Sequence, residues 1–231
     1  MTNGIHDRIP VRRHRIAELD VYEVSNEELE GLERAGVGTA ADPCSKQLGG
    51  GSFEDLSLQF MEHYLQGANN TLPGLGQYHI ATAAGDRCVT LASMDPTTTI
   101  SVAGNVVTNT GAGAPQVVKL TDGPLTIAGT PSVDATVTAL GLNNRAFFAL
   151  AVGTSAADAK IVQNNVYPLN DPSPVLGVRQ HIELPSVAID VPAGQSLFLL
   201  VSPTSDMFIG HGSRTPGVIQ LAGVQVNLPQ R

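Results

Sequence analysis

Serine beside glycine is the first combination in this sequence that could do chemistry. It occurs in "GGGSFE", "VGTSAA" and "GHGSRT". A nucleophile elbow needs Gly-x-Ser-x-Gly at a strand–turn–helix junction, where the hydroxyl is exposed beside an oxyanion-hole amide. None of the three segments has both glycines, so we interpret their serines as loop residues. We expect no acyl-enzyme chemistry from this chain by itself.

A second group of polar residues lies in the glycine-rich segment "IGHGSRTPG". His211, Ser213 and Arg214 are candidates for the rim of an active site in a neighbouring domain, because loops that a rigid scaffold positions often carry function. The alternative is an exposed loop with no such role. His79 and His181 lie within strand patterns and are expected on solvent faces.

We expect no cofactor and no metal site. Asp134, Asp190 and Asp206 do not cluster in the sequence, so they predict neither a calcium loop nor a carboxylate pair. Cys44 and Cys88 lack the close Cys/His spacing of a zinc site. One bridge between the two cysteines is possible, and two unrelated buried thiols are the favoured interpretation.

The overall charge narrows the classes of partner. The net charge of −8 argues against nucleic acid, which requires a basic stripe. The compact basic cluster of Arg12, Arg13, His14 and Arg15 is expected to be a solvated tail. The first residues, "MTNGIHDRIPVRRHRI", contain no apolar segment typical of a secretory signal, and no run is long enough to span a bilayer, so we expect a soluble chain with no membrane partner.

The elements that must position these residues change in type near residue 73. Before it, helices are predicted over 25–36, where Ser25 and Glu28 form a capping box, and over 52–67, with a glycine-rich loop over 37–51 between them. The second helix places apolar residues on one face that needs a covering surface: Leu56, Phe60, Met61, Tyr64 and Leu65.

After residue 77 the apolar residues alternate with a period of two. Short strands are predicted in "QYHIATA", "RCVTLAS", "TTTISVAG", "QVVKLT", "PLTIAG", "VDATVTAL", "RAFFALAVG", "AKIVQ", "RQHIEL", "AIDV", "SLFLLVS" and "GVIQLAGVQVNL". Glycine, proline, asparagine or aspartate separates them. This pattern predicts a mainly β chain with a jelly-roll-like antiparallel sandwich, preceded by a short helical segment.

The segment "AIDVPAGQSLFLLVSPTSD" combines two strands around a tight turn at Gly194. Residues 196–202 are apolar on both sides. Such a strand lies either between its own core and another domain or wholly inside the sandwich. In both cases Leu197, Leu199 and Val201 should be buried, together with Phe147 or Phe148.

Three of these segments resemble the Xaa-Pro dipeptidyl-peptidase and cocaine-esterase-like (CocE/NonD) family of hydrolases. "VPAGQSLFLLVSPTSD" is similar to the last sheet of its C-terminal domain. "GPLTIAGTPSVDATVTALGLNNRAFFALAVG" resembles its strand leading into two core strands, and "FEDLSLQFMEHYLQG" its helix that ends the α/β-hydrolase core. Together the matches cover roughly residues 53–228.

The resemblance implies a division into residues 1–72, the end of a hydrolase core, and residues 73–231, a galactose-binding-like C-terminal sandwich. "TNGIHD" resembles the loop that carries the family's catalytic histidine, so His6 would be the general base, with serine and aspartate upstream. A terminal residue without a role is the alternative for His6. The expected partner is an upstream hydrolase core or a second copy of the chain.

Two other classes of function remain open. A free-standing carbohydrate- or ligand-binding module would use a jelly-roll groove, although sugar platforms favour exposed tryptophan, which this sequence lacks. A structural subunit would tolerate strands rich in threonine and alanine.

Overall fold

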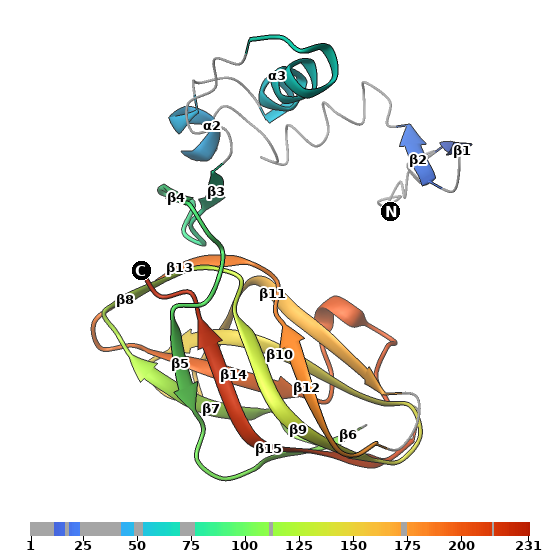
Figure 1. Ribbon diagram of the computed structural model, residues 1–231. Helices are drawn as coiled ribbons and strands as arrows, with labels where there is room; N and C mark the ends of the chain where they lie inside the picture. Colours follow the sequence, from blue (N-terminus) through green and yellow to red (C-terminus); the bar gives the residue numbers. More distant parts are fainter. Residues whose placement is uncertain are drawn as a thin grey trace, which may run out of the picture. The chain divides into compact units, whose positions relative to one another are not determined.

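The computed structural model describes residues 12–16, 19–23, 43–48, 53–69, 77–110, 113–171, 175–213 and 215–231 (Figure 1). The chain divides into two compact units, Met1–Leu75 and Gly76–Arg231.

The first unit begins with two paired strands, β1 (Arg12–Ile16) and β2 (Leu19–Glu23). The basic cluster at 12–15 is therefore part of a strand that pairs antiparallel with β2, and the expectation of a tail is wrong, while the solvation of its side chains stays a prediction. The register sets Arg12 opposite Glu23 and Arg15 opposite Asp20. Residues of opposite charge on facing strands favour such a pairing. The prediction of a tail considered only the basic residues of the first strand.

The structure describes two helices in the same unit. Residues 43–47 form the short helix α2 (Pro43–Gln47) inside a segment expected to be a loop. Proline suits the first position of a helix, because the N–H that it lacks would be unpaired there. The helix predicted over 52–67 is confirmed as α3 (Phe53–Gln66), whereas the helix predicted over 25–36 lies outside the described residues.

Helix α3 ends as the sequence predicts. Gly67 adopts a φ of 68°, and its N–H donates to the His63 carbonyl over 3.1 Å, while the N–H of Ala68 donates to the Glu62 carbonyl over 3.2 Å. The bond from Gly67 to the carbonyl four residues back, with Gly67 in the left-handed conformation, is an αL cap, which favours glycine at this position.

The second unit is an antiparallel sandwich of two main sheets, as predicted (Figure 1). The β14 sheet has the order β11-β10-β14-β7, and the β15 sheet has the order β12-β9-β15-β5, with β6 also paired to β15. The strands are β5 (Thr98–Ser101), β6 (Val106–Thr110), β7 (Gln116–Asp122), β9 (Ser132–Leu140), β10 (Asn144–Gly153), β11 (Lys160–Asp171), β12 (Val175–Glu183), β14 (Ser196–Ser202) and β15 (Gly217–Leu228).

This strand order is that of a jelly roll. Because β5 and β6 share one edge of β15, they act together as a first strand, and β7, β9, β10, β11, β12, β14 and β15 follow as the second to eighth. In that count the sheets run 1-8-3-6 and 2-7-4-5, so each consecutive pair of strands changes sheet except β10 and β11.

Two smaller strand pairs complete the unit. β8 (Leu125–Gly129) pairs with β13 (Val187–Val191), and β3 (Tyr78–Ala81) pairs with β4 (Cys88–Leu91). Ile127 and Ile189 pack in the main core, whereas Ala128 and Ala188 form a separate cluster with Leu91. The β8–β13 pair therefore contacts the sandwich core with one face and the β3–β4 hairpin with the other.

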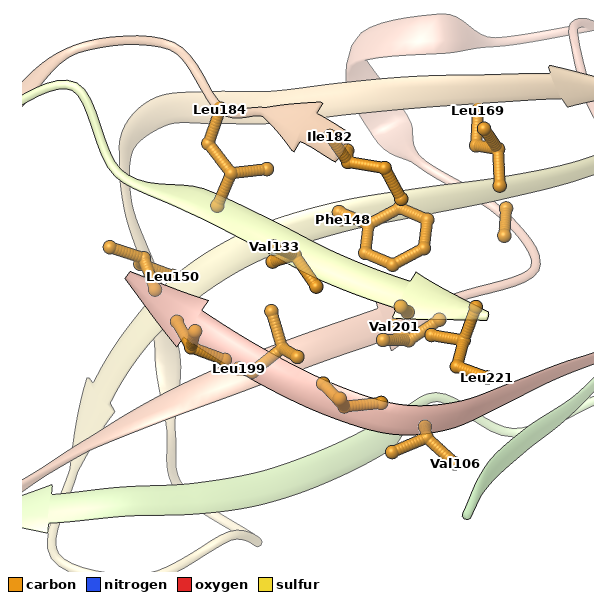
Figure 2. Close-up of a cluster of buried hydrophobic side chains, with 14 of the residues drawn as sticks. Val106, Val133, Phe148, Leu150, Leu169, Ile182, Leu184, Leu199, Val201 and Leu221 are labelled. Carbon is orange, nitrogen blue, oxygen red and sulfur yellow. The ribbon is translucent and has the colours of Figure 1, made fainter. Parts of the chain in front are cut away.

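The core between the two main sheets contains the side chains that the alternation of apolar residues along the strands predicts (Figure 2). Leu197, Leu199, Val201 and Phe148 are completely buried, as expected. Figure 2 shows Leu199 and Val201 beside Phe148, Val133 and Leu221, which come from both sheets.

Three strand segments were not predicted. They are β6, the second half of β11 and the first half of β12. Pro168 and three asparagines weaken the strand pattern of β11. Proline is tolerated there because β11 is an edge strand, bonded only to β10.

Neither cysteine is a free thiol. Cys44 and Cys88 are both disulfide-bonded, so the expectation of two unrelated buried thiols is wrong. Spacing along the sequence carries no information on whether two cysteines meet in space, which is what decides the bond. Of the helices that the structure describes, none has the length and apolar character needed to cross a bilayer.

A buried asparagine holds an irregular part of β11. Opposite β10, the register shifts between Ala149 and Ala151, and Asn165 fills the shifted stretch with its side chain 1% exposed. Its Oδ1 accepts a hydrogen bond of 3.2 Å from the Leu150 N–H, and its Nδ2 donates to the Pro185 carbonyl. The amide thus replaces ladder bonds that the bulge removes.

We expect Asn165→Ala to lower the free energy of unfolding by about 1–3 kcal/mol, because it leaves the buried Leu150 N–H and the partly buried Pro185 carbonyl without this partner. Asn170→Ala is the matched control: this exposed β11 residue bonds only the surface side chain of Arg145, and its loss should cost about 0.5 kcal/mol or less. Urea denaturation measures both. Equal costs for the two variants would contradict the role given to Asn165.

Candidate functional site

The outer face of the β14 sheet also carries apolar side chains. Strand register sets Phe147 opposite Ser202, and Ala149 opposite both Leu200 and Val166. Phe147, Ala149 and Val166 are buried in a small cluster of their own, with Leu200 packed against it. Something other than the main core must therefore cover this face.

The connection between β14 and β15 supplies part of that cover. It contains the 3-10 helix η1 (Asp206–Phe208), whose Phe208 ring stacks on Phe147 with 5.5 Å between ring centroids. Ser205 caps η1 by accepting a hydrogen bond from the Met207 N–H over 3.3 Å. The sequence left two alternatives for the second face of residues 196–202: another domain, or the interior of the sandwich. The structure shows neither of these as the contact, because the chain's own loop after β14 packs on that face.

Arg145 at the start of β10 fastens this connection. Its guanidinium donates to the His211 carbonyl over 2.7 Å, and its backbone N–H donates to Ser213 Oγ over 2.8 Å. Ser213 Oγ returns a 3.3 Å hydrogen bond to the Arg145 carbonyl. Arg145 thus bonds to the His211 carbonyl and to the Ser213 hydroxyl, and these bonds position the loop.

The structure brings together two of the four residues predicted for a site. His211 and Ser213 lie in this one loop, and the His211 side chain is exposed. Arg214 and His6 lie outside the described residues. The assignments of His6 as a general base and of the loop as a substrate rim stay predictions.

A pocket of about 400 Å³ lies between η1 and the outer face of the β14 sheet. Its size falls in the range of small-molecule sites. The walls come from β10, β11, β14 and the loop after β14. They are Pro115, Phe147, Ile161, Gln163, Val166, Leu200, Ser202, Thr204, Ser205, Asp206 and Met207.

One wall residue has a strained backbone. Gln163 adopts a φ of 50°, in the left-handed region that costs a residue with a Cβ about 1 kcal/mol. It lies in the same shifted stretch of β11 as Asn165. The bulge therefore places the Gln163 backbone and side chain at the pocket.

We expect Gln163→Gly to be more stable than Gln163→Ala by about 1 kcal/mol, because glycine adopts this φ without steric cost. Asn143→Gly serves as the comparison, since Asn143 also has a positive φ, 54°, but asparagine tolerates it better. Relative to the wild type, Asn143→Gly should therefore gain less stability than Gln163→Gly. A Gln163→Gly protein less stable than Gln163→Ala in urea denaturation would refute the strain.

A row of polar side chains crosses the outer face of the β15 sheet. His181 Nδ1 lies 2.9 Å from Asp134 Oδ1, and Asn227 donates to Asp134 Oδ2 over 2.6 Å. Thr99 in turn donates to Asn227 Oδ1 over 2.8 Å. The bond from His181, with that from Asn227, holds the pKa of Asp134 below its ordinary value. Asn227 also donates to Ser132 Oγ over 3.1 Å. Among the described contacts no hydroxyl bonds to His181, so no base is placed to activate one, and the row is a surface network.

This network should make stability depend on pH. A carboxylate whose pKa is lowered on folding stabilises the protein above its unfolded pKa, about 3.9, and that contribution is lost as pH falls through the folded pKa. Asp134→Asn should therefore cost about 0.5–1 kcal/mol at pH 7, since the pair faces solvent, and progressively less below pH 4. Glu183→Gln, on the neighbouring strand, should show no such trend in denaturation at pH 7 and pH 2.5. A pH-independent cost for Asp134→Asn would contradict the assignment.

Other charged groups stabilise turns and strand pairs. Hydrogen bonds from Arg87 and then Thr126, each 2.5 Å, lower the pKa of Asp190. Bonds from Ser155 and Thr154 lower the pKa of Asp158 in the turn after β10. No group of three metal-ligating side chains occurs in the part of the chain that the structure describes.

The known proteins similar to this chain are found by structure and not by sequence. No family model and no curated protein matches the sequence. A CocE/NonD family hydrolase from Staphylococcus aureus matches with a TM-score of 0.51 at 11% identity, over 78% of this chain and 46% of that one. What they share is a fold.

Two further structures have lower scores. An aminopeptidase from the marine sediment archaeon Thaumarchaeota archaeon gives a TM-score of 0.49 at 9% identity, over 77% of this chain and 44% of that one. An α-amino acid ester hydrolase gives 0.36 at 14% identity, over 51% and 25%. This chain thus spans less than half the length of each of these proteins.

Sequence reasoning missed the pocket. Burial was predicted for Phe147 or Phe148, but the orientation of Phe147 toward the outer face, beneath η1, was not predicted. Gln163 and Asp206 carried no motif. The one available signal was the apolar character of residues 196–202 on both sides, which requires a cover for the second face.

Proposed function

We propose that residues 73–231 are the C-terminal sandwich of a serine hydrolase or peptidase resembling Xaa-Pro dipeptidyl-peptidases and CocE-type esterases, and that residues 1–72 are the end of its hydrolase core. The observation that carries this is the jelly-roll unit, whose fold matches a CocE/NonD hydrolase over most of this chain and under half of that enzyme.

In this proposal the sandwich supports catalysis without performing it. Acyl transfer needs a nucleophile, a base and an oxyanion hole in one place. This sequence contains no nucleophile elbow, and Ser213 is bonded to the backbone of Arg145. The sandwich would instead help to wall the substrate pocket or support oligomer contacts.

Helix α3 is the proposed contact with the catalytic segment. Its exposed apolar side chains are Leu58, Phe60, Met61, Tyr64 and Leu65, the last of them 78% exposed. Apolar surface of this extent on one helix usually marks an interface. An upstream hydrolase core would cover it and would also explain "TNGIHD", whereas a second copy of the chain would explain only the helix.

We expect residues 1–231 alone to hydrolyse neither p-nitrophenyl acyl esters nor Xaa-Pro substrates. Combined with the catalytic segment encoded directly upstream, the chain should gain activity that a serine-directed phosphonate abolishes. His6→Ala should remove at least 10³-fold of that activity, because the general base is lost, and should leave assembly unchanged in light scattering.

His79→Ala is the matched control, since it removes a different histidine, half-buried on β3, and should leave activity intact. Phosphonate-sensitive turnover by the isolated chain would contradict the proposal. So would an active assembly that is indifferent to His6→Ala. A chain that joins no catalytic segment would favour a free-standing binding or structural module.

A further inference from the structure

The pocket beneath η1 combines an apolar floor with a rim that carries both apolar and polar side chains. Phe147, Val166 and Leu200 form its floor on the β14 sheet. Ile161 and Met207, which are 42% and 48% exposed, line its mouth. A ligand that fills it should therefore place a hydrocarbon body on the floor, because a polar group there would lose water without gaining partners.

The charge at the pocket has one sign. Among the described residues that line it, only Asp206 is charged. Its side chain is exposed, and none of the residues that the structure describes forms a hydrogen bond or ion pair with its carboxylate. A free carboxylate beside an apolar wall complements a cation and repels an anion.

Uncharged polar groups are also available at the pocket. Gln163 is held there in its left-handed conformation, and backbone strain of this kind is concentrated at ligand sites. Ser202 Oγ is already engaged, since it donates to the Thr204 carbonyl over 2.6 Å. Gln163 is therefore a second polar contact for a ligand at Asp206.

We propose that this pocket binds a small primary amine with an aromatic or branched apolar body. The body packs on Phe147, Val166 and Leu200, and the ammonium group bonds to Asp206. The carboxylate suits the ammonium group of such a ligand, and the apolar floor suits its body. The pocket volume of about 400 Å³ accommodates an arylalkylamine. The site lies within residues 76–231 and is independent of the hydrolase assignment.

The test measures the binding of three probes of similar shape to the full chain, with NMR amide shifts as the readout. 2-Phenylethylamine should bind about three- to tenfold more tightly than neutral 2-phenylethanol, the effect of one partly exposed ion pair. Phenylacetate should bind more weakly than the alcohol. The preference for the amine should shrink as salt is raised. Amide shifts should map to β10, β11, β14 and η1.

Asp206→Asn should reduce amine affinity to that of the alcohol while leaving the alcohol's own affinity unchanged. Glu183→Gln is the matched control, an exposed carboxylate on the other sheet, and should change neither. Thermal unfolding of each variant reports whether it folds. Equal binding of amine and alcohol, an Asp206→Asn protein that keeps the preference, or shifts mapped elsewhere would each overturn the proposal.

Discussion

The structure depends on the need to cover one sheet twice. β10 and β14 carry apolar side chains on both faces, so the β14 sheet is stable in water only if each face has a cover. The inner face packs on the β15 sheet, where Leu199 and Val201 meet Phe148 and Val133. The outer face is covered in part by the connection after β14, with Phe208 against Phe147.

That second cover explains several features that otherwise look unrelated. Arg145 bonds the far part of the connection to the start of β10. The shifted stretch of β11 brings Gln163 to the same surface. Because the connection is short, it leaves part of the face open, and the opening is the pocket. The loop that covers the outer face of the β14 sheet therefore also forms one wall of the pocket.

The sequence predicted what depends on local pattern. Alternation identified the strands of the sandwich, and the apolar run at 196–202 predicted that Leu197, Leu199 and Val201 are buried. Segments whose strand character comes from tertiary context were missed: β11 runs through Pro168 because edge position tolerates it. The pocket was missed for the same reason, since Phe147, Gln163 and Asp206 meet only after three separate segments have folded. The pairing of β1 with β2 was missed because charge was considered without the pairing of opposite charges across strands.

The edges of the two sheets bear on how copies of this molecule meet. One edge of β15 is divided between β5 and β6, with a turn at Gly104 between them, and β12 is bent at Gly177. β11 contains a bulge and Pro168, and β7 is short and carries Lys119. Each edge thus lacks a long, flat row of free backbone groups, the feature on which strands of separate molecules stack into fibrils. Pairing of strands from separate copies of the molecule is therefore disfavoured at these edges.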